Sequence, residues 1–145
     1  MTKATQSTEY PVNRIKSLVH YWMSIWDTNA EDATALVDLL SPEGFVLHTT
    51  THPEPITTVA ELQSWYAELH KQVKTDSHQV TSIEIEKLPS GRFRVMTNIT
   101  CPGVTTNNEP FLLTSVHDWE VADYGGVFPK ICELRSKVTM HDVKK

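Results

Sequence analysis

The segment LLTSVHDWEVADYGG (residues 112–126) decides the fold, because its side chains alternate between two chemical characters. One alternating set is mostly bulky and apolar: Phe111, Leu113, Ser115, His117, Trp119 and Val121. The other set ends in two acids: Leu112, Thr114, Val116, Asp118 and Glu120. A period of two is typical of a β-strand with one buried face. His117 and Asp118 therefore point to opposite faces and cannot form a catalytic pair with each other.

Three more runs have the same strand-like period: residues 78–88 (HQVTSIEIEKL), 92–101 (RFRVMTNITC) and 130–140 (KICELRSKVTM). Turn-forming residues separate the four runs at 89–91, 102–110 and 124–126. Consecutive strands joined by short turns predict an antiparallel meander. The face carrying Phe111 and Trp119 is expected to be the buried one.

Helical patterns precede this sheet. Apolar residues recur at helical spacing over 12–26, 29–40 and 59–73, and a short strand is predicted at 45–50. Asn29 is a candidate N-cap for the second helix. The order predicts an α+β fold with the helices on one face of the sheet. We expect residues 1–10 to be a flexible tail and 11–142 to form a single domain.

Composition narrows the function classes. The chain has 145 residues, a formal net charge of −5 and a pI of about 5.8, which argues against nucleic acid or anionic membrane as the main partner. It has no apolar run long enough to cross a bilayer and no signal-peptide pattern, so a cytoplasmic location is expected. Two cysteines are too few for a disulfide framework, and we expect both to be buried thiols.

This element order, from Val12 to about Met140, resembles the NTF2-like superfamily and most of all its SnoaL-like and ketosteroid-isomerase-like domains. The resemblance is carried by the stretches YWMSIWDTNAEDATALVDLLSPEGFVLHT, ITTVAELQSWYAELH and VHDWEVADYGGVFPKICELRSKV. It implies a cone in which three N-terminal helices pack on a strongly bent antiparallel sheet and enclose an apolar cavity. Ligand sites usually lie in such concavities beside a few convergent polar groups.

The resemblance nominates catalytic residues. His117 falls where isomerase-like relatives keep a protonated aspartic acid, so it is either a proton shuttle or a semi-buried, hydrogen-bonded histidine. Tyr21 falls near the oxyanion-hole tyrosine, or is a plain amphipathic core residue. Thr49 falls at the general-base position, where it cannot act as a base. His48 lies beside it, and alternation predicts that only one of these two faces the cavity.

Further residues complete the predicted site. Asp27 is similar to an acid of some dehydratase members and is interpreted as a turn or capping residue. His78 has no partner that the sequence identifies, and Glu133 is predicted to point away from the core. His48 and His52 lie four residues apart on a strand and loop, which gives no metal-binding geometry. The predicted ligand-contacting residues are Trp119, Ser115, Trp22, Tyr66 and Thr49.

Two functions remain open. The first is a lyase-, isomerase- or cyclase-type enzyme without cofactor or metal, acting on a small hydrophobic molecule through His117, with Tyr21 and His48 as partners. The second is a non-catalytic module that binds a small ligand or another protein. In either case the apolar members of the outer set, Leu112 and Val116, predict a homodimer formed through the outer face of the sheet.

Overall fold

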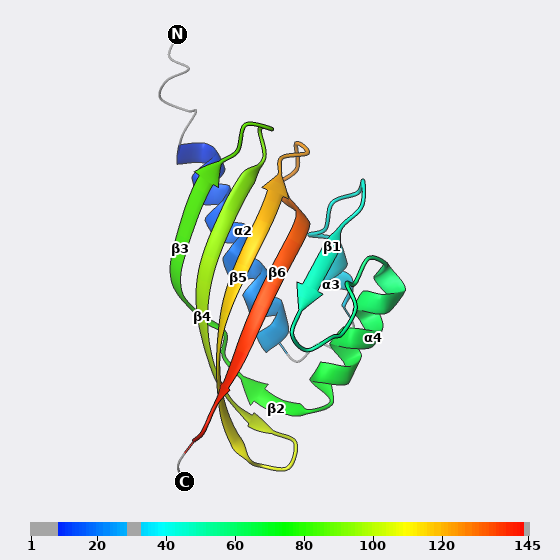
Figure 1. Ribbon diagram of the computed structural model, residues 1–145, viewed down its shortest axis with the longest axis vertical. Coiled ribbons are helices and arrows are strands. Elements are labelled where there is room, and N and C mark those ends of the chain that lie inside the picture. Colours follow the sequence, from blue (N-terminus) through cyan, green and yellow to red (C-terminus); the bar gives the residue numbers. More distant parts are fainter. Residues whose placement is uncertain (1–8, 29–32, 144–145) are drawn as a thin grey trace.

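The computed structural model describes residues 9–28 and 33–143, which form a curled sheet with helices in its concave side (Figure 1). The first helix, α2, is the longest, and three of the strands exceed ten residues. In chain order the elements are α2 (Glu9–Asp27), α3 (Thr34–Val37), β1 (Val46–Thr49), α4 (Val59–His70), β2 (Val73–Asp76), β3 (Gln79–Lys87), β4 (Phe93–Thr105), β5 (Pro110–Ala122) and β6 (Lys130–His141).

The strands form one six-stranded sheet in the order β1-β6-β5-β4-β2, and β3 also pairs with β4. The pairings β3–β4, β4–β5 and β5–β6 are antiparallel, as the meander prediction requires, whereas β1 pairs with β6 in parallel. The long strands bend. As a result β4 pairs with β2 over its last residues, Gly103 to Thr105, and with β3 over Phe93 to Thr100. This bend produces the cone that the α+β prediction implied.

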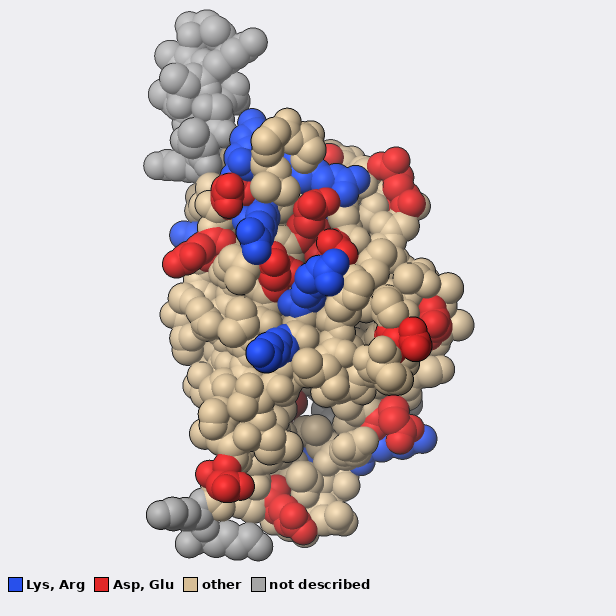
Figure 2. Space-filling model, viewed as in Figure 1, with Lys and Arg blue, Asp and Glu red and all other residues tan. Residues whose placement is uncertain are grey.

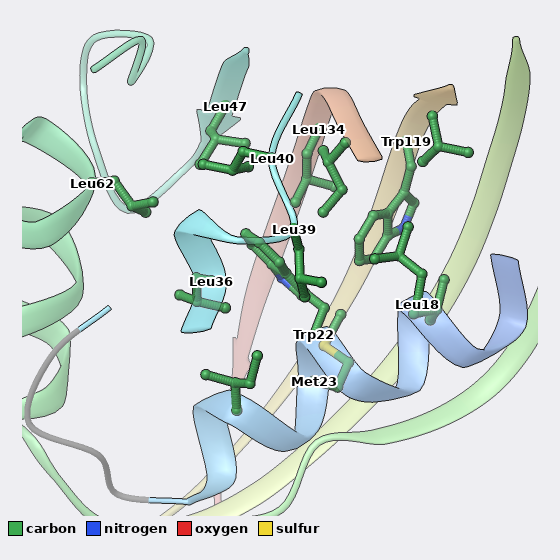
Figure 3. Close-up of a cluster of buried hydrophobic side chains, with 14 of the residues drawn as sticks. Leu18, Trp22, Met23, Leu36, Leu39, Leu40, Leu47, Leu62, Trp119 and Leu134 are labelled. Carbon is green, nitrogen blue, oxygen red and sulfur yellow. The ribbon is translucent and has the colours of Figure 1, made fainter. Parts of the chain in front are cut away.

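The apolar stripe of α2 packs against the inner face of the sheet and forms the core (Figure 3). Trp22 from α2 meets Trp119 from β5 edge to face, with ring centroids 6.0 Å apart. Both side chains are almost completely buried, and burial of large aromatic rings supplies much of the driving force for folding. Leu47 from β1 and Leu134 from β6 close the core at the sheet's other edge.

Several predicted boundaries need correction. The third helix ends at His70 instead of Val73, and the chain then forms β2, which the sequence prediction missed. The second helix is a single turn at Thr34–Val37, and its predicted Asn29 cap lies outside the described residues. The first helix begins at Glu9, while the rest of the predicted tail, residues 1–8, also lies outside them.

The predicted turn at 102–110 is shorter than expected because β4 continues through Pro102 to Thr105. Gly103 makes this possible: a Cβ there would lie 2.2 Å from the Phe111 ring and 2.7 Å from the Thr75 carbonyl oxygen. Only glycine allows Phe111 to lie against the backbone at this point. No helix within the described residues is both long and apolar enough to cross a bilayer.

Candidate active site

The concave side of the sheet encloses a cavity of about 480 Å³ between α2, α4 and the strands. Its wall is mostly apolar, with three tryptophans, and its polar groups gather at a few places. None of the described residues that line it is Lys or Arg. The main apolar lining residues are Trp22, Met23, Trp26, Leu47, Trp65, Leu69, Phe111, Leu113 and Leu134.

A histidine–aspartate pair lies at one side of this cavity. The ring Nδ1 of His78, just before β3, donates to Asp27 Oδ1 at 2.6 Å. The backbone N–H of His78 also donates to Asp27 Oδ2 at 2.9 Å, so the carboxylate at the end of α2 fixes both the ring and its backbone. His78 lines the cavity, whereas Asp27 does not. Asp27 therefore supports His78 from behind, as the third member of a catalytic triad does.

The pair stabilises a proton on His78. Burial disfavours the imidazolium, but the hydrogen bond to Asp27 and the contact with Cys101 outweigh burial and raise the pKa of His78 to about 10. Burial likewise opposes ionisation of Asp27, yet its bonds with His78 lower the pKa of that carboxyl. At neutral pH this site therefore holds an imidazolium and a carboxylate.

A second carboxyl group stands beside the pair. Asp76, the last residue of β2, lines the cavity, and its Oδ2 lies 3.9 Å from His78 Nδ1. Burial raises the pKa of Asp76 to about 6, although the charge of His78 acts in the opposite direction. Asp76 thus titrates in the range where a general base works best.

Asp76, His78 and Cys101 are also the group among the described residues that offers O, N and S ligand atoms within 4.8 Å of one another. Such a donor set suits a borderline cation such as Zn²⁺. A protonated imidazole has no lone pair to give to a cation, however, and its Nδ1 is already engaged by Asp27.

His117 lines the same cavity, as the alternation of β5 predicts. Its Nε2 lies 2.9 Å from Ser115 Oγ, while its buried Nδ1 has no hydrogen-bond partner among the described residues. Burial, with the nearby positive charge of His78, lowers the pKa of His117 to about 3. The ring is neutral at physiological pH, and the unpaired Nδ1 is a buried polar atom whose hydrogen-bonding capacity is unused.

Two predicted ligand contacts lie behind the cavity wall instead of in it. Trp119 is fully buried, donates from Nε1 to Thr97 Oγ1 at 3.0 Å and stacks against His117. Tyr66 is fully buried and packs against Trp26 and His70, with centroids 4.8 Å and 5.4 Å apart. Neither is a lining residue of the cavity. The predicted contacts Trp22, Ser115 and Thr49 do line it.

The structure corrects two further predictions. Tyr21 is 43% exposed, stacks on Phe128 and does not line the cavity, because it projects from the solvent side of α2. His48 and Thr49 both line the cavity, although alternation predicted only one of them, because β1 is a four-residue edge strand at the rim. The His48 ring itself lies 3.1 Å from Glu133, which is not a lining residue.

Asp27 and His78 form a pair that sequence reasoning did not bring together. Asp27 was interpreted as a cap or turn residue, and 51 residues separate the two along the chain. The one signal that pointed to Asp27 was the resemblance to dehydratase members. No local pattern pointed to Asp76, since the strand that carries it was not predicted.

The outer face of the sheet carries a different chemistry (Figure 2). Arg94 binds Asp118 with both guanidinium nitrogens, and Arg92 binds Glu120 at 2.7 Å. The second alternating set of β5 therefore lies on the outer face, as its two acids predicted, and both acids form ion pairs there. On the same face Val116 of β5 is 43% exposed, and Lys137 of β6 is its cross-strand partner.

Comparison with known proteins supports the fold alone. No family model matches the chain, and no curated protein matches it. A solved structure provisionally assigned as a scytalone dehydratase from Novosphingobium aromaticivorans superposes with a TM-score of 0.80 and 14% identity, covering 97% of this chain and 93% of that one. A type 2 hexachlorocyclohexane dehydrochlorinase, LinA, gives a TM-score of 0.73 and 13% identity, covering 95% and 91%.

A protein with a cystatin-like fold from Caulobacter vibrioides matches with a TM-score of 0.69 and 11% identity, covering 89% of each chain. The chain thus shares the α+β fold of these proteins, one of which is described as cystatin-like, and the structure agrees with the fold expected from the sequence. At these identities the likeness carries no residue roles, so any function must be argued from the cavity itself.

Proposed function

We propose that the protein is a cofactor-independent lyase or isomerase that moves a proton on a small, uncharged and largely apolar molecule. The observation that carries this proposal is the His78–Asp27 pair, in which a carboxylate outside the cavity fixes a histidine that lines it. A structural histidine needs only one satisfied partner. Two further polar groups at the same cavity, Asp76 and His117, have pKa values displaced in opposite directions, which is common at catalytic sites.

The cavity wall defines the class of substrate. Its tryptophans favour a flat or cyclic apolar skeleton, and an anionic substrate would find no lysine or arginine among the described lining residues. A carbonyl or hydroxyl group is expected at the polar side, between the histidines. Elimination of a small leaving group suits this arrangement, since it requires one group to take a proton and another to assist departure. The names dehydratase and dehydrochlorinase of two similar structures describe eliminations of this kind.

Binding and turnover can be tested separately. Trp22, Trp26 and Trp65 line the cavity, so 1-tetralone, a neutral bicyclic ketone, should change the tryptophan fluorescence when it binds. A panel of neutral cyclic β-hydroxy ketones and chlorinated cyclohexanes would then be screened for loss of water or chloride. We expect turnover in the wild type and in Asp118→Asn, whose changed side chain lies on the outer face. Turnover should be lost in His78→Gln.

The second candidate function, a non-catalytic binding module, predicts a different outcome. In that case 1-tetralone binds equally well to wild type and His78→Gln, and no member of the panel is converted. The unpaired Nδ1 of His117 fits a ligand-binding role as well as a catalytic one. The His78–Asp27 pair favours the enzyme, because a binder of neutral ligands gains nothing from a buried imidazolium.

We further propose that two copies associate through the part of the outer sheet face that surrounds Val116. Val116 is 43% exposed there, beside the β-strand hydroxyl of Thr114, and a second copy would remove it from water. Sedimentation at micromolar concentration should give a dimer for the wild type and a monomer for Val116→Asp. A monomeric wild type contradicts the proposal. The matched control, Val127→Asp, changes an exposed valine away from the sheet.

A further inference from the structure

Asp76 lines the cavity, and the proposed function gives it no specific role. Three side chains with acid–base capacity lie together here, but only two of them face the ligand: Asp76 and His78 line the cavity, and Asp27 does not. The side chain of Asp76 is 13% exposed, and its carboxylate lies 3.9 Å from the His78 ring. That spacing lets both groups contact one small molecule.

We propose that Asp76 is the base that removes the proton from the substrate, and that the His78 imidazolium, held by Asp27, is the acid that protonates the departing atom. This assignment rests on the proposed function and deepens it. It makes Asp76 a catalytic residue and Asp27 a positioning residue. The histidine of the pair then donates a proton in the elimination step instead of accepting one.

Backbone geometry holds Asp76 in position. The residue pairs with Gly103 across the β2–β4 ladder, and the next N–H, from Ser77, donates to the carbonyl of Pro102 at 3.0 Å. The small Gly103 leaves room for the Phe111 ring, which lines the cavity with Asp76. Asp76 therefore sits on a fixed strand end beside an apolar wall, where a poorly solvated carboxylate is a stronger base than in water.

The neighbouring charges favour this division of roles. Asp76 is faced by His78, by Asp27 from α2 and by His70 from α4. Cys101 from β4 contacts His78, and His117 from β5 is the remaining titratable group of the wall that senses its charge. Burial raises the pKa of Asp76 to about 6, and the pKa of His78 is raised to about 10 despite burial. Between these values the dominant form is a carboxylate beside an imidazolium, so no rare protonation state is needed.

The same two pKa values disfavour the opposite assignment of the acid and base roles. If His78 were the base and Asp76 the acid, the histidine would have to be neutral while the carboxyl is protonated. With pKa values of about 10 and about 6, that combination is a minor species at every pH. That minor species has the same pH limbs, near 6 and 10, as the dominant one, so variants of the two residues, and not the shape of the pH profile, separate the two assignments.

The ring opening of 5-nitrobenzisoxazole tests the base directly, without knowledge of the natural substrate. A base removes the proton from C3, the electrons of that C–H bond form the nitrile, and the N–O bond breaks. The oxygen leaves as the coloured nitrophenolate, its developing negative charge stabilised by the imidazolium of His78, and the product is followed by its absorbance. The compound is neutral, bicyclic and flat, as the cavity requires.

We expect the wild type to accelerate this reaction over acetate at equal concentration. Asp76→Asn should lower kcat/KM by about 100-fold, the usual contribution of a general base. Asp118→Asn, an isosteric change at the outer-face ion pair, should leave it unchanged. The wild-type profile of kcat/KM should rise through about pH 6 and remain level until about pH 10.

Three results overturn the assignment: no acceleration by the wild type, full activity in Asp76→Asn, or a profile that rises only near pH 10. Binding of 1-tetralone to Asp76→Asn shows that its cavity is intact. If that variant does not fold, a wild-type profile that rises only near pH 10 would still exclude a base with the pKa of Asp76. Full activity in Asp76→Asn together with loss in His78→Gln would leave the proposed function standing and refute only the role of Asp76.

Discussion

His78 and His117 line one cavity and hold opposite protonation states. The pKa of His78 is raised to about 10, because the hydrogen bond to Asp27 outweighs burial. The pKa of His117 is lowered to about 3 by burial, and only a serine hydroxyl accompanies it. The same side chain is thus an acid at one side of the cavity and a neutral hydrogen-bonding group at the other. Partner chemistry, not residue type, sets the role of each.

The two histidines also show that residues adjacent in sequence can lie apart in the fold, whereas residues distant in sequence can lie in contact. His117 is followed directly by Asp118, yet β-strand alternation sends that carboxylate to Arg94 on the outer face. His78 is 51 residues from Asp27, yet the two are 2.6 Å apart. The bend of the sheet brings the start of β3 to the end of α2, and the functional pair exists only in the folded chain.

The largest expected difference between the two histidines is in turnover. His78→Gln removes the acid and should lower kcat/KM for 5-nitrobenzisoxazole by about 100-fold or more. His117→Gln keeps a neutral polar group and should cost only about tenfold, most of it in KM, since one hydrogen bond to substrate contributes about 1 kcal/mol. Equal losses in both variants, measured at pH 8, would remove the distinction between them.

A smaller effect is expected when the partner of His78 is changed. Asp27→Asn keeps the size of the side chain but removes its charge, so the pKa of His78 should fall well below 10 while that of His117 stays low. As the pH is raised, the activity of this variant should therefore begin to decline at a lower pH than that of the wild type. The check is the basic limb of the pH profile, with Asp123→Asn, an exposed aspartate, as the control.

The smallest effect is on stability. The folded pKa of His78 exceeds its ordinary value of 6.5, so its contribution is complete below pH 6.5 and is lost as the pH rises toward 10. The folded pKa of His117 lies below 6.5, so stability is lost as the pH falls from 6.5 toward 3.

Urea unfolding of wild type and variants across this range measures both contributions. The alkaline loss attributable to His78 should be about 2 kcal/mol, the usual scale for a charge-assisted hydrogen bond, and should vanish in His78→Gln. The acidic loss should vanish in His117→Gln. Identical pH profiles for the wild type and both variants would mean that neither histidine has a displaced pKa.

The sequence was informative where a period repeats over many residues. The alternation of 111–121 correctly predicted which side chains of β5 face inward, including Ser115 and His117, and which carry the surface ion pairs. The helical stripe of α2 likewise predicted the burial of Trp22. In both cases a regular backbone repeats the same physical requirement at every second or every third to fourth position.

Features set by a few residues, or by contacts between distant segments, were not predictable. β2 has four residues, and its apolar Val73 extends the helical stripe of α4, so nothing in the pattern marks the change of backbone. Because β2 was not predicted, Asp76 was not predicted as a site residue either. Tyr21 was misplaced because a residue flanking a helical stripe can face either the core or water, and here it is exposed.

The most direct test of the central claim is an NMR titration of the histidine rings in the wild type, with assignments from His78→Gln and His117→Gln. We expect the His78 ring to remain protonated until about pH 10 and the His117 ring to remain neutral down to about pH 3. If both rings titrate together near pH 6.5, His78 and His117 do not differ in protonation state at neutral pH. The mechanism that depends on this difference is then wrong.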